Sequence, residues 1–325
     1  LCDSTIDSGD IMGRTATVRL PRKLGSPRVF NGVITEFCRL GRDTTTGRRF
    51  MYMVTLGPRL ELTRYCNRYR VFHRRSPLSV AVELLKAWQI DHELMVDANE
   101  HVPHQQIIQF NESDFDFLQR LLRQEGVFYY FEHHKKPSES ETSESENDDD
   151  SEDASKSSKD EEPEFTHTMI LRDSLPRKDD EEVEPLFYDP TNEREECLYD
   201  WFTKDTLGPQ NVFLDDYNYE DEDGHYQHGP VSTRQTLNVN ERTKRMMTCD
   251  HVGHYHRVED RKARMFEYGG LQARRHAAAY RAAQVSWEGR TTHPDVGIGT
   301  MIRILDFPGM DDAAGFVKEA RYHHR

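Results

Sequence analysis

The stretch that most constrains the fold is residues 111–134, NESDFDFLQRLLRQEGVFYYFEHH, where a helical pattern passes directly into a strand pattern. Ser113 is a favourable N-cap, Asp116 follows three residues later as in a capping box, and acidic side chains suit the first turn of a helix. Gly126 is placed to end the helix in a left-handed conformation, and the aromatic residues after it favour a strand. The predicted apolar face of the helix consists of Phe115, Leu118, Leu121 and Leu122. The sequence therefore predicts a one-sided helix that enters a strand without a loop.

The rest of the chain reads mainly as strands. Residues 15–20, 28–37 and 49–56 alternate in polarity between Pro, Gly and Thr clusters, which indicates antiparallel strands. The motifs PLFYD, CLYDWF and NVFLDDYNY predict further strands, and the runs GTMIRIL and FVKEARYHH predict a closing antiparallel pair joined by FPGMDD. Only 35% of the residues are apolar and 31% are charged, so much of the surface must be solvated or buried against partners.

Two more helices are expected. Ser76 is the N-cap of the first, with Pro77 at its first position. Its predicted buried stripe consists of Leu78, Ala81, Val82, Leu85 and Trp88. The longest candidate covers residues 258–285, where Gly269 and Gly270 could interrupt the helix.

The negative charge of the chain is concentrated in one segment. The net charge is −15, but residues 135–164 hold thirteen Asp and Glu against four Lys, a net of −9 that leaves −6 elsewhere. This segment has no large apolar residue and is predicted to be a disordered insertion. Strand-like residues on both sides place it at the tip of a β-hairpin, where a long loop costs little. It is either a tolerated solvated loop or a functional element, such as a docking arm or a phosphorylation substrate.

Residues 111–134 resemble the VgrG proteins, the spike proteins of bacterial type VI secretion, and through them the hub protein of contractile phage baseplates. The family pattern is ESD-F-x-FL-x-RLL-x-x-EG followed by an aromatic YYF strand. The matching residues are Glu112, Ser113, Asp114, Phe115, Phe117, Leu118, Arg120, Leu121, Leu122, Glu125, Gly126, Tyr129, Tyr130 and Phe131. Weaker similarity extends over residues 27–42, 76–88 and 297–325 and is poorest between about 175 and 255.

The resemblance implies a β-rich α+β fold in which two small antiparallel β-barrel domains are interleaved with a mixed α/β domain, as in phage baseplate hubs. Residues 1–75 would be the first barrel domain. The mixed domain takes residues 76–190 and 235–290, with the acidic insertion at 135–164. The second barrel domain takes residues 191–234 and 291–325. In the family, three copies place six barrels around a threefold axis and match the hexameric tube that stacks on the spike.

The strongest alternative is a metal-dependent hydrolase. His251, His254 and His256 lie within six residues in the motif DHVGHYH, and imidazoles at such spacing can bind zinc. The HExxH pattern of a zincin is absent, and Val252, Gly253 and Tyr255 suit a loop or strand rather than a helix. His323 and His324 are a weaker candidate pair. The sequence has no GxSxG, GxxxxGK[ST] or GxGxxG motif, so no catalytic residue and no cofactor is predicted.

Several other classes are disfavoured. The five cysteines, Cys2, Cys38, Cys66, Cys197 and Cys249, are widely spaced, which fits a reducing cytoplasm. No apolar run is long enough to span a bilayer, and no signal peptide is visible. Nucleic-acid binding would need a clustered basic face, for which RYRVFHRR at residues 68–75 is the main candidate, and a solvated or interface strand is the simpler interpretation. The aromatic run 128–131 lacks interleaved cations and predicts sheet packing instead of base stacking.

The resemblance therefore predicts a structural protein and not an enzyme: the hub of a trimeric spike that caps the secreted tube. Its partners would be two further copies, the hexameric tube protein, baseplate components and effectors. Assembly would occur in the cytoplasm, followed by expulsion through the contractile apparatus without a signal peptide. A phage-like tail baseplate hub is the alternative within the same architecture. The chain starts with Leu and ends in YHHR, so we expect a fragment whose needle or effector domain lies beyond its ends.

Overall fold

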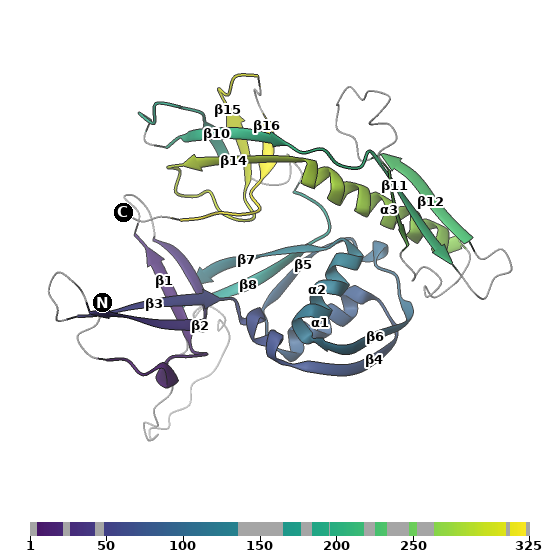
Figure 1. The fold of residues 1–325 in the computed structure, drawn as a ribbon, viewed down its shortest axis with the longest axis horizontal. Helices are drawn as coiled ribbons and strands as arrows, with labels where there is room; N and C mark the ends of the chain where they lie inside the picture. Colours follow the sequence, from purple (N-terminus) through teal and green to yellow (C-terminus); the bar gives the residue numbers. More distant parts are fainter. Residues whose placement is uncertain are drawn as a thin grey trace, which may run out of the picture.

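The computed structural model describes residues 5–21, 27–42, 49–135, 165–176, 184–194, 196–217, 225–232, 247–251, 263–309 and 313–322. The described residues form a β-rich α+β fold in two layers (Figure 1). The lower layer holds the first three strands at one end and two short helices at the other, with a hairpin between them. The upper layer holds the C-terminal strands and one long helix.

The first sheet confirms the three strands predicted at the start of the chain. Its strands are β1 (Thr15–Leu20), β2 (Arg28–Arg42) and β3 (Phe50–Gly57), antiparallel in the order β1-β2-β3. A short 3₁₀ turn, η1 (Ser8–Asp10), precedes them. The long β2 has two register shifts against β3, and such bulges increase the twist of a strand.

The next strand leaves this sheet. β4 (Asn67–Arg75) pairs antiparallel with β6 (His104–Ser113) and not with β1, β2 or β3. The basic run 68–75 is therefore a strand, and its hydrogen-bonding partner comes from the range predicted to be the mixed domain. Two helices pack on the inner face of this pair, and its outer face looks away from the rest of the molecule (Figure 1).

These helices are the two predicted ones. α1 (Pro77–Ala87) begins after Ser76, whose side chain accepts a hydrogen bond from the Ser79 amide. α2 (Asp114–Glu125) is capped by Ser113, which accepts from the Asp116 amide, and ends at Gly126 with φ of 68°. The structure corrects the predicted stripe of α1, because Val80 and Leu84 are buried whereas Val82 and Trp88 are only half-buried.

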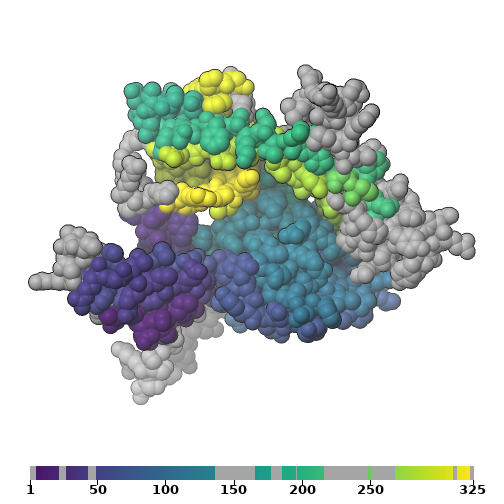
Figure 2. Space-filling view, in the orientation of Figure 1, coloured from purple at the N-terminus to yellow at the C-terminus, as the bar shows by residue number. Residues whose placement is uncertain are grey.

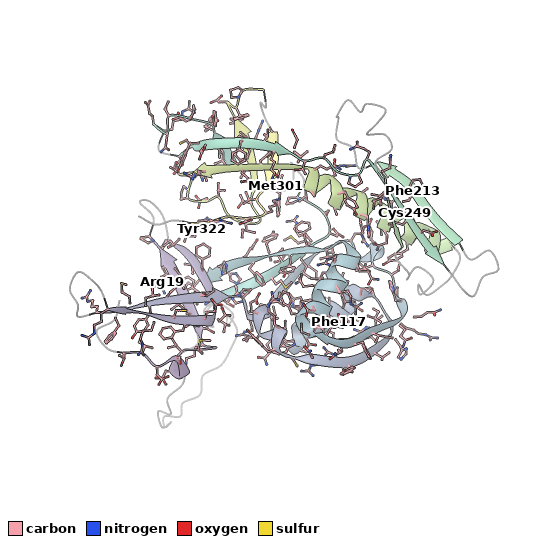
Figure 3. All side chains as sticks on the ribbon, viewed as in Figure 1. Arg19, Phe117, Phe213, Cys249, Met301 and Tyr322 are labelled. Atoms are coloured by element: carbon pink, nitrogen blue, oxygen red, sulfur yellow. The ribbon has the colours of Figure 1, made fainter. Side chains whose placement is uncertain are left out.

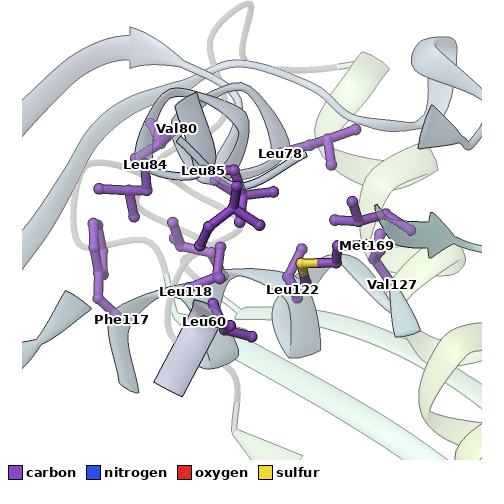
Figure 4. Packing of buried hydrophobic residues seen from close by; sticks show 14 of the residues in the cluster. Leu60, Leu78, Val80, Leu84, Leu85, Phe117, Leu118, Leu122, Val127 and Met169 are labelled. Carbon is purple, nitrogen blue, oxygen red and sulfur yellow. The ribbon is translucent and has the colours of Figure 1, made fainter. Parts of the chain in front are cut away.

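The helices enclose the main hydrophobic core (Figure 4). Leu84 and Leu85 of α1 meet Leu118 and Leu122 of α2, and the 3₁₀ helix η2 (Arg59–Tyr65) closes one side with Leu60. Phe117, which the predicted face of α2 omits, is fully buried here because it stacks on Phe72 of β4. Helix α2 therefore buries a wider face than its sequence predicted.

A hairpin follows α2 after two residues, as predicted. β7 (Phe128–Lys135) and β8 (Phe165–Arg172) are antiparallel, and Lys135 is paired with Phe165. The predicted disordered insertion lies outside the described residues, but the two strands on either side of it form the expected hairpin. β5 (His92–Met95), followed by η3 (Ala98–Glu100), joins β8 in parallel, so the sheet order is β5-β8-β7.

The C-terminal sheet contains β9 (Glu184–Phe187), β15 (Met301–Leu305) and β16 (Ala313–Phe316), in the order β16-β15-β9. Beside it, β10 (Leu198–Asp205) pairs with β14 (Val285–Thr291). The predicted final strand at residues 316–324 is wrong in position, because β16 ends at Phe316. Residues 317–322 leave the sheet and run back towards the first sheet, where Tyr322 contacts Arg28.

The predicted long helix is α3 (Ala263–Gln284), and it passes through Gly269 and Gly270 without a break. It lies on the sheet β12-β11-β13, formed by β11 (Asn211–Tyr217), β12 (His225–Ser232) and β13 (Met247–His251). Tyr268, Ala273 and Ala277 pack against Val212 and Leu214. Because this packing stabilises the helix, it overcomes the low helix propensity of the glycine pair.

The sheets of the described residues have two or three strands each, and none of them closes into a barrel. The architecture is thus the predicted β-rich α+β fold, whereas the two barrels and the three-domain division remain predictions.

Candidate functional site

The hairpin β7–β8 joins the two layers of the molecule. Tyr129 and Phe131 point to the core around α1 and α2. Phe128 and Tyr130 point the other way, and their rings lie 5.6 and 5.9 Å from the ring of Phe316 in the C-terminal sheet. The prediction that this aromatic run packs within the sheet is confirmed, since both of its faces are covered by protein.

One end of the hairpin is bonded to the first sheet through two histidines. The amide of Asn31 on β2 donates to Nδ1 of His133 at 3.1 Å, and the amide of Arg59 donates to Nε2 of His167 at 3.0 Å. Since Nε2 of His167 accepts, its Nδ1 carries the hydrogen and donates to Oδ1 of Asn31 at 3.0 Å. The Asn31 amide group donates in turn to Thr17 Oγ1 on β1. We call Asn31, His133 and His167 the histidine joint.

The histidine joint requires neutral imidazoles. Burial lowers the pKa of His133 to about 4, with further lowering by His167, Arg28 and His134. Burial also lowers the pKa of His167, and Arg59 adds to the effect, whereas Asp91 opposes it. A protonated imidazole has no acceptor nitrogen, so it would lose the bond from the backbone amide. The joint is therefore a structural contact that acid would weaken.

Arg28 connects the first sheet to the C-terminal residues. Its Nη1 donates to the carbonyl oxygens of Pro294 and Val296, each at 3.0 Å. Its guanidinium lies 4.4 Å from the centre of the Tyr322 ring. Figure 3 shows Tyr322 between the first sheet and the upper layer. This contact, which we call the Arg28 clamp, links residues that are more than 260 positions apart.

A buried carboxylate connects α2 to α3. Glu125 is 0% exposed, and its carboxylate lies 2.6 Å from Nδ1 of His101 and accepts from the Tyr268 hydroxyl at 3.2 Å. Arg275 of α3 lies 3.5 Å away and also pairs with Glu100. Burial raises the pKa of Tyr268 well above its ordinary value, and Glu125 adds to this effect, so the phenol stays protonated as a donor. His101, Tyr268 and Arg275 are largely buried around Glu125, and the cluster holds α3 against α2.

The outer face of the β4–β6 pair is an exposed apolar surface. Tyr69 is 66% exposed and Phe110 is 74% exposed, although the two rings contact each other at 5.3 Å. Val71 and Ile108 are the next pair along the strands and are also exposed. Sequence reasoning missed this surface, because the alternation within 68–75 does not reveal which face the helices cover.

The predicted metal cluster is not assembled among the residues that the structure describes. The backbone of His251 lies at the end of β13, whereas His254 and His256 fall outside the described residues, as do His323 and His324. The zinc hypothesis therefore stays a prediction. Cys38, Cys66, Cys197 and Cys249 are free thiols, in line with the widely spaced cysteines of the sequence.

The helices in the described part of the chain include none that is both long and apolar enough to cross a membrane.

The comparisons with known proteins agree with this architecture. The sequence is 26% identical over 126 residues to the type VI secretion system spike protein VgrG1c of Pseudomonas aeruginosa, a match that covers 39% of this chain and 17% of the relative. It is 22% identical over 214 residues to VgrG1b of the same organism, covering 65% of this chain and 25% of the relative. The chain therefore matches a quarter or less of the length of these spike proteins.

Two solved structures share the fold. One is an E. coli component of the type VI secretion system described as similar to the T4 bacteriophage tail proteins gp27 and gp5. It has a TM-score of 0.58 at 14% identity and covers 96% of this chain and 60% of that one. The other is a tail protein from Neisseria meningitidis, with a TM-score of 0.53 at 12% identity over 93% of this chain and 80% of that one.

The sequence pattern of one family matches nearly the whole chain. It is described as the phage tail baseplate hub (GPD) family, and the match runs over residues 1–324. The chain belongs to the phage tail baseplate hub family.

Proposed function

We propose that this chain is the hub of a contractile secretion spike, which assembles as a trimer and caps the secreted tube. The observation that carries the proposal is the match to the baseplate hub family over residues 1–324, together with spike proteins of type VI secretion among the relatives. The joints between the layers of the fold support it. A part that is driven by a contraction needs firm connections between its modules. The structure has three such connections, each partly or fully buried: the histidine joint, the Arg28 clamp and the Glu125–Arg275 pair.

The finer organisation belongs to the same proposal. Residues 1–75, and residues 191–234 with 291–325, would provide two barrel domains per copy. Residues 76–190 and 235–290 would form the mixed domain between them. β4, at the end of residues 1–75, pairs with β6 of the mixed range, so the first barrel domain would be joined to the mixed domain through this pair. Three copies then present six barrel domains to a hexameric tube ring, with baseplate components and effectors as further partners.

Such a part acts mechanically, so no catalytic residue and no cofactor is proposed. It would assemble in the cytoplasm and leave the cell through the apparatus, carrying effectors into a target cell. The alternative, a phage-like tail hub, is favoured by the fold shared with the Neisseria meningitidis tail protein.

Size-exclusion chromatography with light scattering of the purified chain tests the proposal directly. We expect a mass of three chains, about three times 38.1 kDa. A monomer that persists at all concentrations would contradict the hub assignment. To separate the two hub functions, the gene is deleted in its host and release of tube protein into the medium is measured. Loss of release supports a secretion spike, whereas unchanged release favours the phage-like hub.

A further inference from the structure

The outer face of the β4–β6 pair is aromatic and open. Tyr69, Val71, Ile108 and Phe110 form its apolar centre. We call these four residues the aromatic face. In Figure 2 the region formed by β4 and β6, at the lower right, borders on solvent. Exposed aromatic side chains that are grouped on a flat surface are typical of the centres of protein interfaces.

The strand β4 is rich in arginine, although the chain as a whole is acidic. β4 contains Arg68, Arg70, Arg74 and Arg75 and no acidic residue. Arg68 and Arg70 share one carboxylate, that of the buried Asp114, and Arg75 pairs with Glu83. Arg70 bonds Gln109 and Asp114 on the helix side of the pair, so the positive charge that remains after two guanidinium groups share one carboxylate lies beside the aromatic face and not on it.

A complementary surface lies on the same molecule, at the strand β5. This strand is the edge of its sheet, paired with β8 on one side only among the described residues. Leu94 and Met95 are exposed there, 44% and 38% respectively, and as consecutive residues of the strand they lie on opposite sides of its open edge. The segment 91–100 around them has four acidic residues and no Lys or Arg. Its exposed acidic residues are Asp91, Glu93, Asp97 and Glu100, of which Glu100 pairs with Arg275. We call Leu94 and Met95 with this acidic surround the acidic edge.

We propose that the aromatic face of one copy binds the acidic edge of the next copy. A ring of three identical subunits requires a heterologous contact, in which two different surfaces of the same chain meet. The aromatic face and the acidic edge are two such surfaces, apolar at the centre and opposite in charge at the rim. The occupant of the aromatic face is thus a second copy of this chain, and the inference rests on the proposed trimer.

The test compares two double variants of the full chain. Tyr69→Ser with Phe110→Ser removes the aromatic face, and Leu94→Ser with Met95→Ser removes the apolar part of the acidic edge. Each should shift dissociation of the trimer to about 100-fold higher protein concentration or more, because two central contacts are lost at every interface. Phe202→Ser with Leu207→Ser removes apolar side chains that are 49% and 69% exposed elsewhere and should leave the trimer unchanged. Circular dichroism melting curves verify that all three double variants are folded.

Mixing the two defective variants gives a sharper result. A copy with an intact aromatic face can still bind a copy with an intact acidic edge, but the ring cannot close. Light scattering should therefore find a dimer in the mixture, at concentrations where each variant alone is monomeric. A dimer formed by the Leu94→Ser, Met95→Ser variant alone would instead mean that two aromatic faces meet each other, and would overturn the proposal.

The remaining outcomes separate this inference from the proposed function. If the natural chain is a trimer and both double variants remain trimers at the same concentrations, the contact is wrong while the hub function stands. If the natural chain is a monomer at every concentration, the proposed function fails, and the contact fails with it.

Discussion

Asn31 and His167 lie 136 positions apart, yet the Oδ1 atom of one and the Nδ1 atom of the other form a 3.0 Å hydrogen bond at the junction of β2 and β8. The same asparagine donates its backbone amide to His133. One residue of the first sheet thereby holds two histidines of the central hairpin, His133 through its backbone amide and His167 through its side chain. Each imidazole serves as an acceptor only in its neutral form.

Acid should therefore loosen the hairpin. The pKa of His133 in the folded protein is about 4 and that of His167 is also lowered, against about 6.5 in an unfolded chain. A lowered folded pKa contributes stability above pH 6.5 that is lost as the pH falls towards 4. We expect the melting temperature, measured by calorimetry, to drop across this window.

Other groups also titrate at low pH, so the control is a double variant, His133→Gln with His167→Gln. Its amides can accept hydrogen bonds but cannot be protonated in this range. We expect a lower melting temperature at pH 7 but a decrease towards pH 4.5 that is at least about 2 °C smaller. Identical slopes for the two proteins would show that the histidine joint does not titrate as described.

Gly299→Ala should destabilise the protein strongly. Gly299 has φ of +89°, and a Cβ atom there would lie 2.4 Å from Cε2 of the buried Tyr130. Backbone strain and steric overlap together should lower the free energy of unfolding by about 2–4 kcal/mol, measured by urea denaturation.

Gly309→Ala is the matched control, because Gly309 has φ of +79° but nothing within 4 Å of the added Cβ. It should cost only the strain, about 1 kcal/mol. Equal losses for the two substitutions would mean that Tyr130 moves aside at no cost.

Glu125→Gln should release α3. The substitution removes the negative charge next to Arg275 and His101, so the buried guanidinium loses its compensating charge. We expect a loss of about 3 kcal/mol in the free energy of unfolding. Hydrogen exchange should also rise in α3, whose docking depends on this cluster.

Glu100→Gln serves as the comparison, since Glu100 pairs with the same arginine but its side chain is 46% exposed. Its substitution should cost under about 0.5 kcal/mol. A double variant, Glu125→Gln with Arg275→Met, should recover part of the loss, because no buried charge is then uncompensated. If the losses in unfolding free energy from Glu125→Gln and from Arg275→Met simply add in the double variant, Glu125 and Arg275 do not interact directly.

Arg28→Lys should weaken the contact between the first sheet and the C-terminal residues. Lysine keeps the charge but cannot bond both the Pro294 and Val296 carbonyls in the same planar geometry while it stacks on Tyr322. We expect a loss of about 1–2 kcal/mol in the free energy of unfolding and faster proteolysis near the C-terminal end of the chain.

Arg321→Lys tests whether the replacement of any arginine in this region by lysine causes the same loss of stability as Arg28→Lys. Its side chain is 82% exposed and pairs only with the neighbouring Glu319 in the described contacts, so the effect should stay within about 0.5 kcal/mol. A similar loss for both arginines would remove the special role of the Arg28 clamp.

Local signals in the sequence determined the elements of this protein. The cap at Ser113, the left-handed end at Gly126 and the aromatic strand after it follow from interactions within a few residues, and so does the family resemblance that they carry. The hairpin on both sides of the insertion was also predictable, since two strand patterns flank a segment that cannot form a core.

Only the tertiary structure decided how these elements contact one another. The alternation of β4 permits either face to be buried, and the packing of Phe72 under the helices is what leaves Tyr69 exposed. Glu125 resembles a surface residue until α3 brings Arg275 and Tyr268 to it from 143 or more positions away. The histidine partners of Asn31 and the carbonyl partners of Arg28 are also more than 100 positions away in the sequence. Such contacts depend on the three-dimensional arrangement of whole elements, and no spacing within a single segment encodes them.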